Sequence, residues 1–497
     1  MKRLLIYIVI ASTVSVDAVG QTKDDFDEFR DKILGGYSSF QRTTMNDYQS
    51  FRDSINEEYA DFLENTWRQF HGLLPKVSPI KDKPIPPMPY KEGEEGIKDK
   101  ELPYVDIVPI APPTPQPKPV EPIKDQPQPV EERFAFRFYG TEGQVRLDND
   151  MRFSLTGTNE NHVADAWRRL SREKKFDNVI RDCLELRIRY GLCDWAYLQM
   201  LKELGTQFCG ANTNESTLLT AYLYCQSGYK MRIGRGESGR LYLMVASRHC
   251  IYGIPYFQIA GEDYYSLDYK ENSLYICEAS FPKEQPLSLW IAQETKLANK
   301  PSDVRTLKSK RYPQLNVTIQ GNRNLIDFYN SYPTSQVGEN FMTRWAMYAN
   351  TPLAQGMKDS LYPALRNAIQ GKSQQEAANM LLNFVQTAFV YEYDDKVWGD
   401  DRAFFAEESL YYPYCDCEDR SILFSRLVRD LLDLKVVLVY YPGHLATAVH
   451  FTDYITGDYI LLNNQRFTVC DPTYIGAPVG ATMPNMNNEE AKVILLE

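Results

Sequence analysis

Residues 414–432 read YCDCEDRSILFSRLVRDLL, and this stretch decides how the C-terminal part of the chain is interpreted. Apolar side chains recur at helical spacing from Ser421 to Leu432, which predicts an amphipathic helix. Two cysteines, Cys415 and Cys417, lie directly before it among acidic residues. The positive end of the helix dipole and the free backbone N–H groups there both favour a thiolate. The stretch therefore predicts a nucleophilic cysteine at the start of a helix.

Strands are predicted after this helix. A histidine, His444, opens one of them, and Asp471 follows the end of another, at residues 466–470. An imidazole that faces the thiol can take its proton, and a carboxylate on the neighbouring strand can fix the imidazole tautomer. His450 is a competing base, but six residues further along the strand it lies about 20 Å away. Cys417, His444 and Asp471 are therefore the candidate catalytic residues.

This order of motifs resembles the transglutaminase-like superfamily, a papain-related group of cysteine enzymes. The similarity lies in Asp416-Cys417-Glu418-Asp419 before an apolar helix, a histidine at the start of a strand, and Asp471-Pro472-Thr473 after a later one. It covers roughly residues 375–480. Cys417 is favoured over Cys415 because the family's acidic pair follows its nucleophile directly. An aromatic residue often follows the family's histidine, and this chain departs from that pattern.

The resemblance implies roles for the three candidates: Cys417 as nucleophile, His444 as general base and acid, and Asp471 as the residue that orients the imidazole. It implies an α+β fold with a transglutaminase-like, papain-like core at the C-terminus. It further implies a cysteine hydrolase or acyltransferase that forms a thioester from a peptide or glutamine amide, without cofactor or metal. An amidase or peptidase acting on a protein or peptide, cell-wall peptides included, is favoured over a cross-linking enzyme.

Several alternatives to this interpretation stay open. Cys417 is a buried or disulfide-bonded cysteine in one of them, and the protein is then a non-catalytic binding scaffold on the cell surface or in the periplasm. A zinc site is another, although the spacing of its ligands would be poor; these would be Cys415, Cys417, His444 and Cys470. A donor to the oxyanion besides the Cys417 N–H is not identified by any motif, and Trp398 and Gln386 are guesses.

A degenerate second copy of the same fold is predicted upstream. Residues 213–233 can be laid over residues 417–437, and the positions of the candidate residues Cys417, His444 and Asp471 are then held by Thr213, Arg240 and Asp268. The copies are expected at residues 133–300 and 301–497. The first copy lacks the thiol and the imidazole, so it serves as a substrate platform or packs against the second.

The N-terminal residues 1–20 have the pattern of a signal peptide, with Lys2 and Arg3 before a short apolar run and small residues at the expected cleavage site. This pattern predicts an exported protein, in the periplasm, on the cell surface or secreted. No other long apolar run exists, so no integral membrane span is expected after its removal. The chain has nine cysteines, so at least one is expected to stay unpaired in a monomer.

Residues 21–74 carry an aromatic repeat with a period of eleven residues, which includes Tyr48, Tyr59 and Phe70. This period keeps the aromatic side chains on one face of a helix, because it corresponds to about 3.67 residues per turn. The repeat predicts a helical stalk of coiled-coil type. Self-association through residues 22–74, packing on the main body and contact with a membrane surface are all open for its apolar face.

Residues 75–132 hold more than half of the 29 prolines and are expected to form an extended linker, or else a coil against the main body. The chain of 497 residues has a net charge of −11. A nucleic-acid partner is therefore not expected, because such a chain lacks the positive charge that neutralises phosphates.

Overall fold

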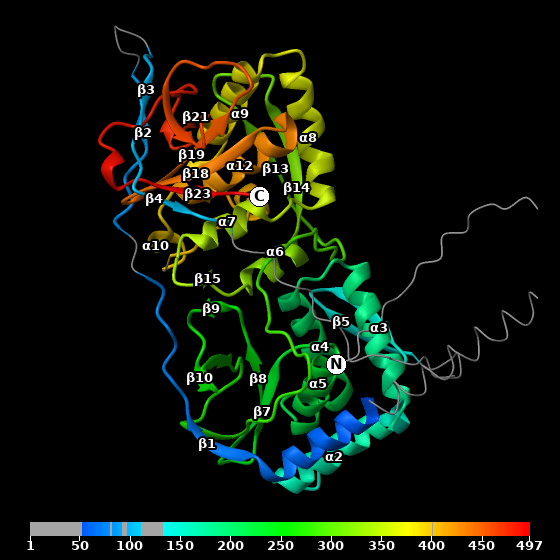
Figure 1. Ribbon diagram of the computed structural model, residues 1–497. Helices are drawn as coiled ribbons and strands as arrows, with labels where there is room; N and C mark the ends of the chain where they lie inside the picture. Colours follow the sequence, from blue (N-terminus) through cyan, green and yellow to red (C-terminus); the bar gives the residue numbers. More distant parts are fainter. Residues whose placement is uncertain (1–51, 80–81, 92–96, 111–132, 400) are drawn as a thin grey trace, which may run out of the picture.

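The computed structural model describes residues 52–79, 82–91, 97–110, 133–399 and 401–497. The predicted signal peptide and residues 21–51 of the predicted stalk lie outside the described residues. The protein is a mixed α+β molecule built from two halves, each with helices packed on a mainly antiparallel sheet (Figure 1). None of the described helices is both long and apolar enough to cross a membrane.

The first half begins with a β-hairpin and continues through four helices into a sheet. The hairpin is β5 (Phe134–Phe138) with β6 (Thr141–Val145), and the helices are α2 (Glu160–Arg172), α3 (Lys175–Arg189), α4 (Asp194–Cys209) and α5 (Asn214–Gln226). The sheet has the order β1-β12-β7-β8-β11-β10. Its strands are β1 (Trp67–His71), β7 (Met231–Gly236), β8 (Leu241–Ala246), β10 (Tyr256–Ile259), β11 (Glu262–Tyr265) and β12 (Ser273–Cys277).

The second half repeats this plan. Its hairpin is β13 (Pro301–Lys308) with β14 (Asn316–Asn322), and its main helices are α7 (Thr343–Asn350), α8 (Gln355–Ile369), α9 (Gln374–Ala388) and α12 (Cys417–Leu432). The sheet has the order β3-β20-β21-β19-β18-β23-β4. Its strands are β3 (Lys100–Glu101), β4 (Asp106–Val108), β18 (Lys435–Tyr441), β19 (His444–His450), β20 (Asp458–Leu462), β21 (Gln465–Cys470) and β23 (Lys492–Leu495).

The two sheets share one strand order. β12-β7-β8-β11-β10 of the first sheet corresponds strand by strand to β23-β18-β19-β21-β20 of the second, and all the neighbours pair antiparallel. The helix before the sheet, α5 or α12, packs on the preceding α4 or α9 in each half. This gives α4 the position in the first half that α9 has in the second. The shared order is what a duplicated fold requires.

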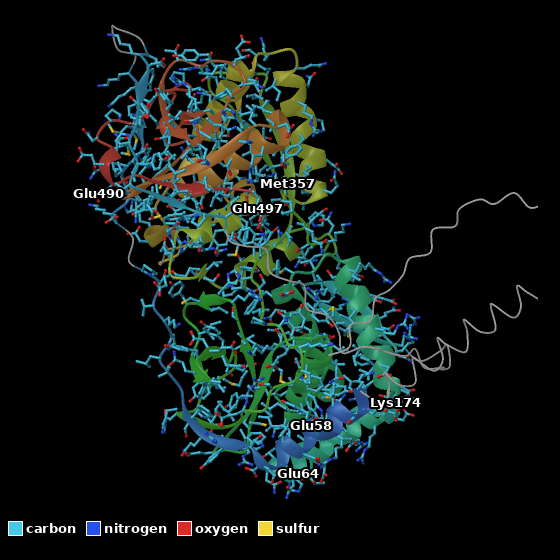
Figure 2. The ribbon with its side chains drawn as sticks, in the orientation of Figure 1. Glu58, Glu64, Lys174, Met357, Glu490 and Glu497 are labelled. Atoms are coloured by element: carbon cyan, nitrogen blue, oxygen red, sulfur yellow. The ribbon has the colours of Figure 1, made fainter. Side chains whose placement is uncertain are left out.

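The two halves are joined by a continuous apolar core. Aromatic rings from the two halves contact each other at the boundary. The ring centroids of Tyr139 and Phe328 lie 5.5 Å apart, and those of Trp195 and Tyr332 lie 6.4 Å apart. Side chains fill both halves, and the labelled Glu58, Glu64 and Lys174 lie at the end of the molecule away from Glu490 (Figure 2). The halves therefore share one hydrophobic interior.

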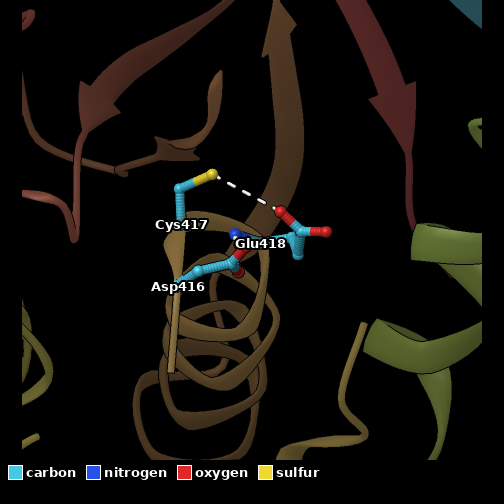
Figure 3. A group of neighbouring side chains, drawn as sticks. All are labelled: Asp416, Cys417 and Glu418. Atoms are coloured by element: carbon cyan, nitrogen blue, oxygen red, sulfur yellow. Dashed lines mark hydrogen bonds between the residues drawn. The ribbon is translucent and has the colours of Figure 1, made fainter. Parts of the chain in front are cut away.

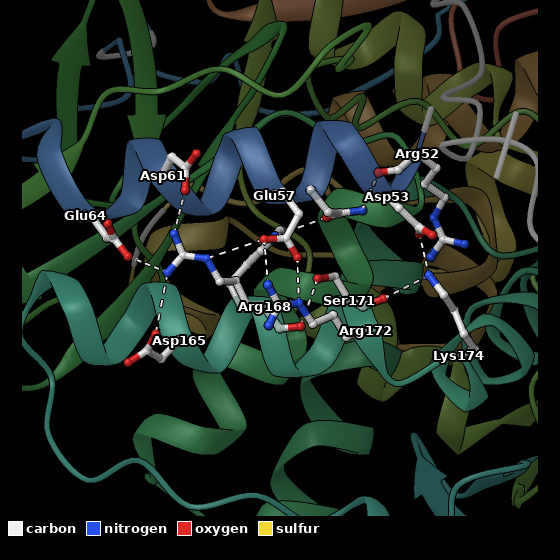
Figure 4. Close-up of polar contacts among 12 residues, drawn as sticks. Arg52, Asp53, Glu57, Asp61, Glu64, Asp165, Arg168, Ser171, Arg172 and Lys174 are labelled. Atoms are coloured by element: carbon white, nitrogen blue, oxygen red, sulfur yellow. Dashed lines mark hydrogen bonds and ion pairs between the residues drawn. The ribbon is translucent and has the colours of Figure 1, made fainter. Parts of the chain in front are cut away.

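Residues 52–65 form a helix that lies against the first half, beside α2 (Figure 4). Tyr59 is 2% exposed and packs on Trp167 of α2, whereas Phe62, also a member of the aromatic repeat, is 40% exposed. The buried Arg52 forms an ion pair with Asp177 at 2.6 Å. Packing on the main body is therefore the arrangement found for this part of the predicted stalk.

The polar face of the same helix is held by charged side chains. Arg168 of α2 forms ion pairs with Asp61, at 2.6 Å, and with Glu64, and Arg172 forms one with Glu57 at 2.7 Å (Figure 4). These pairs are partly exposed, so each adds little stability, and they mainly fix the orientation of the helix.

The predicted stalk helix ends earlier than expected, because residues 67–71 form strand β1 instead of continuing it. β1 pairs antiparallel with β12 over its whole length, from Trp67 opposite Cys277 to His71 opposite Ser273. Residues 67–71 are extended because they form hydrogen bonds with the open edge of the sheet, although their sequence has a helical period. The prediction of a helix up to residue 74 is therefore wrong beyond residue 65.

The described parts of the proline-rich stretch first contact the first half, where Lys76 pairs with Asp263 at 2.5 Å, and then lie along the second half, so they do not form a free spacer (Figure 1). β3 pairs with β20 and β4 with β23, and β2 (Met88–Pro89) pairs with β22 (Tyr474–Ile475), all in parallel. The residues other than proline have backbone N–H groups, so they can form hydrogen bonds with the edge strands β20 and β23 of the sheet. These parts therefore correspond to the alternative of a coil against the main body.

Candidate functional site

The thiol of Cys417 lies at the first residue of α12, four residues earlier than the helix predicted from Ser421. The side chain of Asp416 caps the helix by accepting a hydrogen bond from the N–H of Glu418, and Asp419 accepts one from the N–H of Asp416 at 3.1 Å. This reciprocal capping explains why the acidic residues start the helix. Cys417 is buried at 3% exposure, in the positive end of the helix dipole.

His444 and Asp471 are brought together by neighbouring strands of the sheet. His444 is the first residue of β19, Asp471 follows β21, and the two strands pair with Thr447 opposite Cys470. The Nε2 atom of His444 lies 2.9 Å from Oδ2 of Asp471, and both side chains are buried. The predicted imidazole–carboxylate pair is therefore present in the structure.

The thiol of Cys417 lies in the same small cavity as the His444 ring, of about 20 Å³. Its Sγ atom donates a hydrogen bond to Oε2 of Glu418 at 3.4 Å (Figure 3). Cys417 interacts with His444 closely enough to raise the pKa of the ring. Nδ1 of His444 is buried without a hydrogen-bond partner among the described residues, so it is free to bind a thiol proton.

The charge of the His444 ring is set by opposing effects. Burial lowers its pKa, because it disfavours the charged imidazolium. The carboxylate of Asp471 and the neighbouring Cys417 outweigh burial and raise the pKa of His444 to about 10. The ring is therefore protonated at neutral pH, so a positive charge lies beside the Cys417 side chain.

Gln386 of α9 holds the loop after β21 and does not face the reacting groups. Its Nε2 donates hydrogen bonds to the carbonyl oxygens of Asp471, Tyr474 and Ala477 at 2.8–3.1 Å, and its Oε1 accepts one from the N–H of Gly476. Its side chain is thus engaged, and the guess that it binds an oxyanion is wrong.

Two other residues considered from the sequence lie away from the cavity. Trp398 packs on the rings of Phe404 and Tyr412, with centroids 5.8 and 5.0 Å away, and does not line the cavity. His450 lies at the far end of β19, with its Nδ1 atom 2.9 Å from the carbonyl oxygen of Arg466. It is therefore not a competing base.

Sequence reasoning missed the residues that close the cavity over Cys417. Trp345 of α7 and Tyr440 of β18 form part of its wall, and Asp82 and Pro84 come from the proline-rich stretch. The Tyr440 hydroxyl donates a hydrogen bond to Asp82 at 2.8 Å. The N–H of Ile85 donates to the carbonyl oxygen of Gly443 at 2.9 Å. No local motif indicates these contacts, because they join segments far apart in the chain.

Two groups of side chains among the described residues lie close enough together to hold a metal ion. Asp416, Cys417 and Glu418 place ligand atoms close together, as do Asp394, Asp401 and Glu418. In the first group the Asp416 carboxylate already caps α12. The zinc site considered as an alternative does not assemble within the described part of the chain, since Cys415 and Cys470 belong to neither group.

None of the nine cysteines, all of which are described, forms a disulfide. Cys415 and Cys470 are buried, and burial raises the pKa of both thiols, so neither resembles a reactive thiolate. Among the three C-terminal cysteines, Cys417 is the one that lines the cavity with His444.

The positions that correspond to the candidate triad in the first half also lie together. Thr213 caps the N-terminus of α5, Arg240 directly precedes β8, and Asp268 follows β11. All three line one cavity of about 170 Å³. The sequence comparison of the two copies therefore predicted a real juxtaposition, although no thiol or imidazole is in it.

Comparisons of the chain with protein-family models, with curated proteins and with solved structures find no match. The functional interpretation therefore depends on the geometry of the site.

Proposed function

We propose that the protein is an exported cysteine amidase or peptidase of transglutaminase-like type that acts on a peptide or glutamine amide. The observation that carries the proposal is the buried contact of 2.9 Å between His444 and Asp471, in the cavity that also holds Cys417 at the N-terminus of α12. Nucleophile, base and orienting carboxylate on rigid elements are what acyl transfer through a thioester requires.

The proposed reaction proceeds in two steps at the Cys417 sulfur. The thiolate attacks the amide carbonyl carbon, the C–N bond breaks, and the amine leaves with a proton from His444. Water then attacks the thioester while His444 takes one of its protons, which releases the carboxylic acid and restores the thiolate–imidazolium pair. An amine in place of water would give transamidation.

Asp471 has a positioning role in this proposal. Its carboxylate raises the pKa of His444 and holds Nε2, which leaves Nδ1 for proton transfer with the thiol and the leaving amine. Gln386 and the N–H of Thr473 in turn fix Asp471: the first holds its backbone carbonyl, and the second donates to its carboxylate at 2.8 Å.

Alkylation with iodoacetamide at neutral pH tests the proposal, with mass spectrometry to separate the nine thiols. Cys417 is expected to react at least tenfold faster than the other cysteines, because a thiolate is the nucleophile. The advantage should disappear in His444→Ala and persist in His450→Ala, a matched change at the far end of the same strand. Slow and equal labelling of all thiols would contradict the proposal.

A non-catalytic binding scaffold is the second candidate. It is favoured by the small size of the cavity, about 20 Å³, and by the hydrogen bond that the Cys417 thiol donates to Glu418. The labelling experiment separates the candidates, because a scaffold has no reason to keep one thiol ionised.

A further inference from the structure

The first half contains a cavity at the place that corresponds to the candidate active site. Its walls come from α4, the N-terminus of α5, strand β8 and the residues after β11. The volume of about 170 Å³ far exceeds the 20 Å³ or so beside Cys417. It is large enough for a small organic molecule or one amino-acid residue.

The charged groups of this cavity favour an anion. Lys202 of α4 forms an ion pair with Asp268 at 3.0 Å, so these two charges balance. Arg240 lies with its guanidinium 5.4 Å from the centre of the Tyr242 ring and has no ion pair among the described residues. The net charge of the three side chains is thus positive, and the positive end of the α5 dipole adds to it.

Two of the hydroxyl groups that line the cavity have no hydrogen-bond partner among the described residues. Ser216 and Ser266 are 7% and 1% exposed, and the hydroxyl of neither forms a hydrogen bond within the described residues. Both hydroxyls lie on the wall of the cavity, so they are available for hydrogen bonds to a polar group of a ligand. The hydroxyl of Thr213, in contrast, donates to the carbonyl oxygen of Gly210 at 3.0 Å.

Part of the remaining wall is apolar. Leu198 of α4, Leu243 and Val245 of β8, and Leu267 face the same space. A ligand that satisfies the whole cavity must therefore combine an anionic group with an aliphatic body.

We propose that this cavity binds a small aliphatic carboxylate, whose anionic group lies at Arg240 and the N-terminus of α5 and whose aliphatic part contacts the leucine wall. A C-terminal residue of a peptide and a free N-blocked amino acid share this chemistry. The site binds without reacting, because Thr213 stands at the position of Cys417 and Arg240 at that of His444. The inference does not depend on catalysis by the second half.

Isothermal titration of the full chain with N-acetyl-L-leucine, N-acetyl-L-leucinamide and the tripeptide Gly-Gly-Leu tests this site. The acid is expected to bind at least tenfold more tightly than the amide, since the amide lacks the charge that Arg240 recognises. Tighter binding of the tripeptide than of the acetylated amino acid would identify a peptide terminus as the source, and the reverse would identify a free acid.

Arg240→Gln should weaken binding of the acids at least tenfold, and Lys202→Gln should weaken it less, because Lys202 is already paired. Arg137→Gln, a matched change of an exposed arginine on β5, should leave binding unchanged. The proposal is overturned by equal binding of acid and amide or by full binding to Arg240→Gln. Absence of binding for both acids at about 10 mM would also overturn it, because a millimolar site would then be mostly filled.

Discussion

Replacing Asp471 by asparagine removes the carboxylate that holds the proton on His444 and changes little else in size. Burial then dominates, so the pKa of His444 should fall from about 10 to its usual 6.5 or below. This fall of over three units corresponds to a free energy on the order of 5 kcal/mol for protonation of the ring, at about 1.4 kcal/mol per unit. At neutral pH the imidazolium is lost, and with it the positive charge beside Cys417.

The sign of the effect on stability follows from the same shift. A pKa that is raised in the folded state stabilises the fold fully below the unfolded value of about 6.5, and this contribution disappears as the pH rises through about 10. The wild type should therefore exceed Asp471→Asn in free energy of unfolding most clearly at pH 6, and the difference should shrink toward pH 10.

Nuclear magnetic resonance of protein labelled at the histidine rings measures this directly, because the chain has five histidines and single substitutions assign them. The His444 signal should not titrate between pH 5 and 8 in the wild type and should report a neutral ring at pH 7.5 in Asp471→Asn. Urea unfolding at pH 6 and pH 10 gives the stability difference. A His444 pKa near 6.5 in both proteins would refute the reasoning.

Three further predictions concern the parts that surround the site. Tyr59→Ala should lower the free energy of unfolding by about 3–5 kcal/mol in a urea titration, since it removes a buried ring. Phe62→Ala on the exposed side should change this free energy by less than about 1 kcal/mol. Similar losses for both variants would show that the 52–65 helix does not pack on the first half as described. Asp82→Ala should speed alkylation of Cys417 about two- to tenfold, because it loosens the segment over the cavity, and an unchanged rate would argue against a covering role. Gln386→Leu leaves backbone carbonyls buried without a donor, so thermal and urea unfolding should show that the free energy of unfolding falls by about 2–4 kcal/mol. A fall of less than about 0.5 kcal/mol would show that these carbonyls do not depend on Gln386.

The candidate site was accessible to sequence reasoning because its parts have local signatures. An acidic residue that caps a helix places Cys417, and strands joined by short turns bring His444 to Asp471. The walls of the cavity have no such signature. Trp345 and Asp82 reach it from distant segments, and hydrophobic periodicity describes one element at a time.

The stalk shows a different limit. Its eleven-residue period predicts a helix equally well on both sides of residue 65, and the sequence alone does not say that β12 offers an unpaired edge to residues 67–71. The repeat likewise predicts the same environment for Tyr59 and Phe62, although Tyr59 is buried and Phe62 is exposed. Tertiary contacts decided both outcomes.

Strands β3 and β4 have a consequence for biosynthesis. They are translated long before β20 and β23, the strands with which they pair near the end of the chain. β3 and β4 therefore have no strand to pair with until the last residues leave the ribosome. Until then, β20 and β23 are the unpaired edge strands of the second sheet. A version of the protein that starts at residue 133 would keep those edge strands exposed permanently, so we expect it to aggregate even though Cys417, His444 and Asp471 are all present.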